Sequence, residues 1–209
     1  MNAVTAWFRD YWQYAAALVL VAVATVFLWV KAVRAHRAHQ TRFHAEEEKL
    51  RRLADLKTKY RELTGDVIAD APKEELLAGV ALHLQLWLQK QPDMKAAFAS
   101  LPAEAQFVYA LDVFTDDGPR EFFKQNGAPL LWVIAPAFAA IGLTDEVPTV
   151  RKLALMFDET DETTSLDASA LAQAEKDWDD RDLLTQIKLA GAEYIQKNSA
   201  RFSDLRLTD

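Results

Sequence analysis

The spacing of apolar positions along the chain changes several times, and each change indicates a different element. Residues 14–30, YAAALVLVAVATVFLWV, form the longest apolar run, and no charge falls between Asp10 and Lys31. A helix of roughly 20 apolar residues crosses a hydrocarbon core of about 30 Å. Aromatic residues of the kind found at membrane interfaces lie at both ends, namely Tyr11, Trp12, Tyr14 and Trp29. We expect a transmembrane helix over 11–33, after a short extracytoplasmic N-terminus over 1–10.

The residues that follow the apolar run set its predicted orientation. Lys31, Arg34 and Arg37 form a basic cluster, and such clusters stay on the cytoplasmic side. A cleaved signal peptide is the main alternative, but it favours a positive start and a small-residue cleavage site. A buried helix of a soluble protein would not favour these aromatic and basic flanks. The sequence therefore predicts a single-pass anchor in the cytoplasmic membrane of a bacterium, with the N-terminus outside and the C-terminal domain inside.

A basic juxtamembrane helix is predicted over 34–65. Its apolar stripe recurs at spacings of three and four, through Leu50, Leu53, Leu56, Tyr60 and Leu63. The repeat is short for a coiled coil, so we expect the stripe to pack on the following domain. A homodimer is compatible with the stripe and is not required by it. Gly65 is expected to end this helix as its C-cap.

Helical periodicity continues over 66–209, and strand patterns are almost absent. The run PLLWVIAPAFAAIGL is expected to be buried and to break or restart near Pro136. A helix with Pro148 near its first position is expected to turn one set of residues inward, namely Val150, Leu153, Leu155 and Met156. The closing segment predicts one or two helices. The predicted fold class is all-α, with about seven helices including the anchor.

Charge is divided unequally between the two halves of the chain. Residues 1–100 hold 14 Lys and Arg and 11 Asp and Glu, whereas residues 101–209 hold 10 and 20. The basic half suits an anionic partner such as the lipid bilayer, and the acidic half suits a cationic one. The acids concentrate in DETDE and DWDDRD, which supply Asp158, Glu159, Asp161, Glu162, Asp177, Asp179, Asp180 and Asp182. These acids are candidate protein-interaction residues.

The stretch DDGPREFFKQNG combines acids, two turn signals and an aromatic pair. Gly118 and the pair Asn126 and Gly127 are typical turn residues, and Phe122 and Phe123 are expected to be anchored in the helical core. The acids that this stretch can present to a partner are Asp116, Asp117 and Glu121.

The segment LPAEAQFVYALDVFTDDGPREFFKQNGAPLLWVIAPAFAAIGL resembles the helical domain family of DNA mimic protein 19. The resemblance rests on Gly118, Phe122 and Phe123, with Ala140, Ile141 and Gly142 at the end of the segment. It covers roughly Lys73 to Phe202 and implies a compact α-helical domain. For some members it implies an acidic face that copies duplex phosphates.

Four positions depart from the family pattern. Asp116 and Asp117 stand where the pattern prefers Asn and Gly, Pro119 replaces an aromatic residue, and Glu121 replaces Gln. The turn is therefore expected to persist, while the polar groups that it displays differ.

Motifs for catalysis or for cofactor binding are missing from the sequence. Cysteine is absent, His36 and His39 lack a third ligand nearby, and the acids look solvated. We therefore predict no catalytic residue, no metal and no cofactor. The acidic residues have three interpretations: a solubilising surface, a docking surface for a protein partner, or a DNA mimic. The sequence favours a non-enzymatic, membrane-anchored adaptor without direct nucleic-acid binding. The alternatives are a regulator that sequesters a DNA-binding protein and, more weakly, an enzyme acting on a cationic substrate.

Overall fold

The computed structural model describes residues 47–125, 128–156 and 168–203 of the chain. Helices and turns account for these residues, and no strand occurs among them. The all-α prediction is confirmed for this part of the chain. The predicted membrane helix over 11–33 lies outside the described residues, and no helix within them has both the length and the apolar character needed to span a bilayer.

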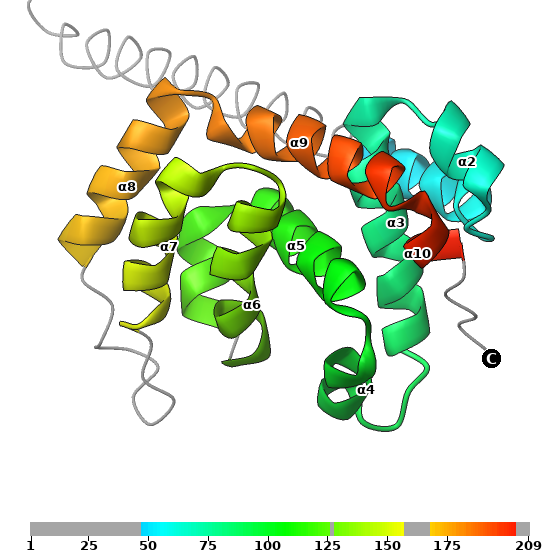
Figure 1. Ribbon diagram of the computed structural model, residues 1–209, viewed down its shortest axis with the longest axis horizontal. Coiled ribbons are helices and arrows are strands. Elements are labelled where there is room, and N and C mark those ends of the chain that lie inside the picture. Colours follow the sequence, from blue (N-terminus) through cyan, green and yellow to red (C-terminus); the bar gives the residue numbers. More distant parts are fainter. Residues whose placement is uncertain (1–46, 126–127, 157–167, 204–209) are drawn as a thin grey trace, which may run out of the picture. The chain divides into compact units, whose positions relative to one another are not determined.

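Residues 54–209 belong to one compact unit, and residues 47–53 belong to the preceding unit. Figure 1 shows the helices of the compact unit. In chain order they are α2 (Gly65–Asp70), α3 (Lys73–Leu88), α4 (Met94–Ser100), α5 (Ala103–Gln125), α6 (Ala128–Ala140), the 3-10 turn η1 (Thr144–Glu146), α7 (Val147–Ala154), α8 (Ala168–Asp180), α9 (Leu183–Lys197) and α10 (Ser199–Ser203).

The core lies where α9 crosses α3 and α5 (Figure 1) and where α5 packs on α6. Phe114 of α5 is fully buried, and four aromatic rings surround it at centroid distances of 5.3–6.0 Å. Edge-to-face contacts of this kind stabilise beyond the area that they bury. The four rings belong to Phe122, Phe123, Phe138 and Trp178. A single aromatic cluster therefore joins α5, α6 and α8.

The end of the juxtamembrane segment is seated on α3. Leu56, Tyr60 and Leu63 are buried, and a Cβ on Gly79 of α3 would lie 2.3 Å from the Tyr60 ring. The glycine thus lets the ring lie against the helix backbone. The Nδ1 atom of His83 lies 2.9 Å from the Tyr60 carbonyl oxygen, and it can donate to a carbonyl that the end of a helix leaves without a partner.

The expected end of this helix at Gly65 is wrong. Its helix ends at residue 59, and Gly65 begins α2, because the Thr64 hydroxyl caps α2 by accepting a hydrogen bond from the Val67 N–H at 3.2 Å. The apolar stripe packs on the domain through Leu56, Tyr60 and Leu63, as expected. Its first two residues do not, since Leu50 is 67% exposed and Leu53 is 39% exposed.

The DDGP sequence produces a kink inside α5. Gly118 has φ 81° and ψ 159°, a region that L-residues rarely adopt and glycine adopts easily. Pro119 then begins the second helical part of α5, where a missing N–H costs little. The kink returns the chain so that Phe122 and Phe123 are both buried. The predicted turn and the predicted aromatic anchors thus lie within one bent helix.

Helix α6 runs through Pro136 without a break, which corrects the expected interruption. Pro136 and Trp132, one turn earlier, are both exposed. The carbonyl that the proline leaves unbonded therefore lies on the side where water can reach it. The helix ends at Ala140, and Gly142 in the turn after it has φ 85°. The Leu143 N–H donates to the Phe138 carbonyl at 3.0 Å, a bond typical of a glycine-terminated helix.

Candidate interaction surface

All four acidic residues predicted from DWDDRD lie at the junction of α8 and α9. Asp177, Asp179 and Asp180 are exposed in the last turn of α8, and Asp182 is exposed immediately before α9. Asp182 has a left-handed backbone conformation with φ 50°, which turns the chain between the two helices. We call these four residues the junction acids.

The helix dipoles act on the junction acids in opposite directions. Carboxylates at the C-terminal end of a helix are unfavourable, and α8 has no basic residue in its last turn. The same carboxylates precede the N-terminus of α9, where negative charge is favourable. Within the described residues, Asp179, Asp180 and Asp182 form no ion pair. Their negative charge is therefore not neutralised by a neighbouring cation of that part of the chain.

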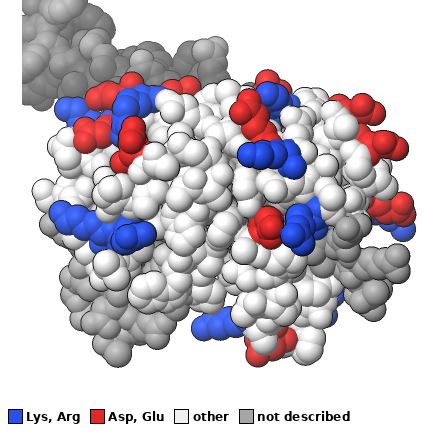
Figure 2. All heavy atoms as spheres, viewed as in Figure 1, with Lys and Arg blue, Asp and Glu red and all other residues white. Residues whose placement is uncertain are grey.

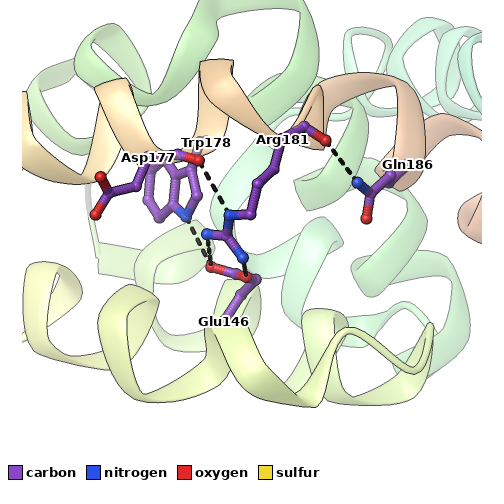
Figure 3. A network of polar contacts seen from close by, with 5 residues as sticks. All are labelled: Glu146, Asp177, Trp178, Arg181 and Gln186. Atoms are coloured by element: carbon purple, nitrogen blue, oxygen red, sulfur yellow. Dashed lines mark hydrogen bonds and ion pairs between the residues drawn. The ribbon is translucent and has the colours of Figure 1, made fainter.

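A polar cluster beneath the junction acids fixes them to the core (Figure 3). The carboxylate of Glu146, only 6% exposed, accepts a hydrogen bond from the Trp178 indole N–H at 2.8 Å. The Arg181 guanidinium also donates to both oxygens of Glu146, with an Nη2–Oε2 distance of 3.1 Å. Arg181 further donates to the Asp177 carbonyl at 3.0 Å, and Gln186 donates to the Arg181 carbonyl at 2.6 Å.

We call Glu146, Trp178 and Arg181 the clamp. Burial opposes ionisation of Glu146, but the hydrogen bonds from Arg181 and Trp178 outweigh burial and hold the pKa of Glu146 below its usual value. Glu146 is therefore a carboxylate at neutral pH. Trp178 also contacts Phe114, at a centroid distance of 5.7 Å. The clamp thus connects the junction acids to the aromatic core and fixes the direction in which they project.

A second group of carboxylates lies at the kink of α5. Asp112 is partly buried, while Asp116 and Asp117 are exposed. Burial, with a further contribution from Asp116, raises the pKa of Asp112 to about 7, and Lys188 of α9 opposes the rise. The Asp112 carboxyl therefore changes charge near neutral pH. Lys188 follows Asp182 by six residues, which is about 9 Å along the axis of α9.

Elsewhere on the described surface, some of the acids are paired with bases. Lys59 pairs with Glu75 at 2.9 Å, and Arg120 pairs with Glu175 at 2.6 Å. Lys73 also lies 2.8 Å from Glu193. On the face drawn in Figure 2, acidic and basic side chains are interspersed, and broad uncharged areas separate them. Asp55, Glu62 and Asp70 are also exposed without an ion pair among the described residues. The junction differs because three such acids lie within four consecutive residues, from Asp179 to Asp182.

The other site residues predicted from the sequence, for partner contact, for the family turn or for the membrane interface, divide into two groups. Glu121, in the second part of α5, is partly buried, and Ile141 and Gly142 end α6 as structural residues. The remaining predicted residues lie outside the described residues: Asn126, Gly127, Asp158, Glu159, Asp161, Glu162, Tyr11, Trp12, Tyr14, Trp29, Lys31, Arg34 and Arg37. Within the described ranges, no three metal-ligating side chains are close enough to hold an ion together.

Sequence reasoning missed both the clamp and Asp112. Trp178 and Arg181 are three residues apart, so they share one helix face, and this spacing was a usable signal for a common partner. The partner itself, Glu146, is more than 30 residues away in sequence, and nothing near it indicates the contact. Asp112 stands alone among Leu111, Val113 and Phe114. An isolated acid in an apolar helical run is a signal for a carboxyl with a raised pKa.

Comparison of the chain with family models, with curated proteins and with solved structures finds no match. The resemblance to the DNA mimic family therefore stays a prediction from the sequence.

Proposed function

We propose that the chain is a non-enzymatic, single-pass membrane adaptor whose helical domain binds a protein partner through the junction acids. One observation carries the proposal: Asp179, Asp180 and Asp182 are exposed and unpaired within the described residues, on a junction that the clamp holds to the core. A fixed group of like charges attracts a basic surface and favours one orientation of it. A purely solubilising charge requires neither a fixed direction nor a buried support.

The membrane part of the proposal rests on the apolar run and its flanks. The span is proposed at 11–33 in the cytoplasmic membrane of a bacterium, with the helical domain on the cytoplasmic side. Because the chain contains no cysteine, two single-cysteine variants test this topology. An impermeant maleimide added to intact cells should label Asn2→Cys and should label Thr185→Cys only after lysis. Extraction of the chain from membranes by alkaline carbonate would exclude the anchor, and external labelling of Thr185→Cys would exclude the orientation.

The docking part is tested with the full chain in lipid nanodiscs as bait. The variant Asp177→Asn/Asp179→Asn/Asp180→Asn removes three charges and keeps side-chain shape. The matched control Asp55→Asn/Glu62→Gln/Asp70→Asn removes three exposed charges elsewhere. We expect chemical crosslinking to the partner to fall at least about tenfold for the first variant and to change little for the control. Equal capture by the wild type and both variants would refute docking through the junction acids.

The same bait distinguishes the adaptor from a DNA mimic. A partner sequestered by mimicry would be released by added duplex DNA, because the DNA and the acidic surface would occupy one site. A partner of the proposed adaptor would stay bound at the same ionic strength. The interspersed charges in Figure 2 and the ion pairs around the domain favour the adaptor, since phosphate mimicry needs unpaired acids over a longer surface.

A further inference from the structure

Helix α7 has an outward face whose chemistry is opposite to that of the junction acids. A shallow, open hollow of about 570 Å³ follows this face. Its lining residues recur at helical spacing along one side of the helix and into the turn after it. They are Val147, Pro148, Arg151, Lys152, Leu155 and Met156.

The apolar part of this face is unusually exposed. Leu155 was expected to point inward, yet it is 64% exposed. The correction has a simple geometric reason: Val150, Leu153 and Ala154 already fill the inward side, and α7 ends at Ala154. Pro148 is exposed on the same face. The hollow therefore presents apolar surface to water at a site that its own helix does not cover.

The basic part of the face is also available. Arg151 and Lys152 are exposed, and neither forms an ion pair with any residue that the structure describes. Their place in the last turn of α7 suits the helix dipole, which explains why basic residues are tolerated there. The dipole does not explain the exposed Leu155 that follows the end of the helix. Two unpaired cations and an apolar hollow together point to a ligand with both an acidic and an apolar group.

We propose that the α7 face is a docking site for an acidic segment of a protein partner. Carboxylates of that segment pair with Arg151 and Lys152, and a large apolar side chain enters the hollow beside Leu155. The volume is at the scale of side-chain and ligand pockets, and a concave site suits an inserted side chain better than a flat lipid surface. The site goes beyond the adaptor function, because it uses residues and a charge sign that the junction acids do not use.

The test uses the full chain in nanodiscs and a random twelve-residue peptide library displayed on phage. We expect the enriched peptides to carry Asp or Glu next to a large apolar residue. The most enriched peptide is then synthesised, and its binding is measured by fluorescence polarisation. Arg151→Glu/Lys152→Glu should weaken binding at least about tenfold, since like charges replace attractive ones, and Leu155→Ser should weaken it several-fold.

Lys176→Glu/Lys197→Glu is the matched control. It makes the same change in net charge at two exposed lysines of α8 and α9 and should change affinity by less than about twofold. Circular dichroism of each variant confirms that the helices are retained.

Three results would overturn the proposal: no enrichment over empty nanodiscs, peptide binding that is unchanged by Arg151→Glu/Lys152→Glu, or binding of the face only to vesicles of anionic phospholipid. Self-association abolished by the same charge reversal would also overturn it, by assigning the face to a second copy of the chain. None of these results bears on the junction acids, so failure of this site and failure of the adaptor proposal are distinguishable.

Discussion

The substitution Glu146→Gln tests whether the clamp stabilises the domain. Glutamine has the shape of glutamate and can still accept the Trp178 N–H, so the change creates no cavity. It removes the negative charge that holds both hydrogen bonds from Arg181. Glu146 is 6% exposed, and a buried carboxylate with three charge-assisted or polar donors is well satisfied. The variant therefore isolates the ionic part of the clamp.

The magnitude follows from the bonds that are lost. A hydrogen bond to a charged group contributes about 1.5–3 kcal/mol to stability. The Arg181 side chain is half exposed, so water recovers part of its hydrogen bonding in the variant. We expect the free energy of unfolding to fall by about 1–2 kcal/mol. For a unit of this size the unfolding temperature should fall by about 3–6 °C.

Thermal unfolding of the full chain in detergent, followed by far-UV circular dichroism, measures the effect. The pKa of Glu146 in the folded protein lies below its usual value near 4.5, so its stabilisation is present above that value and is lost as the pH falls through the folded pKa. The difference between wild type and Glu146→Gln should thus be full at pH 7 and shrink as the pH falls below 4.5. Glu175→Gln, which breaks only the exposed pair with Arg120, should have little effect. A loss of equal size at pH 7 and pH 3, or no loss at pH 7, would refute the role of the clamp.

Three further substitutions test individual features by the same unfolding measurement. Asp112→Asn should stabilise the domain by about 1–2 kcal/mol at pH 8 and have no such effect near pH 4, because the raised folded pKa of about 7 makes ionised Asp112 destabilising at high pH; stabilisation at pH 4 that equals that at pH 8 would contradict this. Gly79→Ala should cost about 1–3 kcal/mol, because the new methyl group would lie 2.3 Å from the Tyr60 ring, and an unchanged unfolding temperature would show that the ring has room to move. Asp182→Gly should stabilise by up to about 1 kcal/mol by relieving the left-handed backbone, and destabilisation would show that the Asp182 side chain supports the junction.

Local sequence signals predicted that the chain is helical. They failed to predict helix ends and burial where contacts between distant residues determine them. The stripe from Leu50 to Leu63 predicted one long helix, but burial of Tyr60 against Gly79 ends that helix early. Proline predicted a break in α6, yet exposure of Pro136 removes the cost of its missing hydrogen bond. Leu155 fits the helical spacing of the apolar residues and was expected to be buried, but α7 ends before it, and its side chain is exposed.

The candidate interaction surface was also predicted only in part, because local patterns reveal its acids but not the distant contacts that hold them. The junction acids are recognisable in the sequence as a charged run, and the structure exposes them, as is usual for closely spaced aspartates. Their support is not visible, because Glu146 meets Trp178 and Arg181 only after α7 and α8 have packed together. The kink at Gly118 was readable from a Gly-Pro pair, whereas the raised pKa of Asp112 depends on burial that no local pattern reports.

The packing of Tyr60 on α3 limits how far the domain can lie from the proposed membrane. Leu56 is the first residue of the stripe that joins the buried core, so residues 34–55 are all that separates it from the end of the proposed span. Residues 47–55 are helical, so these 22 residues can span at most about 60 Å. With the proposed span in place, a partner has to come within that radius of the bilayer, so its search is confined to a thin layer along the membrane. Confinement of this kind raises the effective concentration of membrane-bound partners over that of freely diffusing ones.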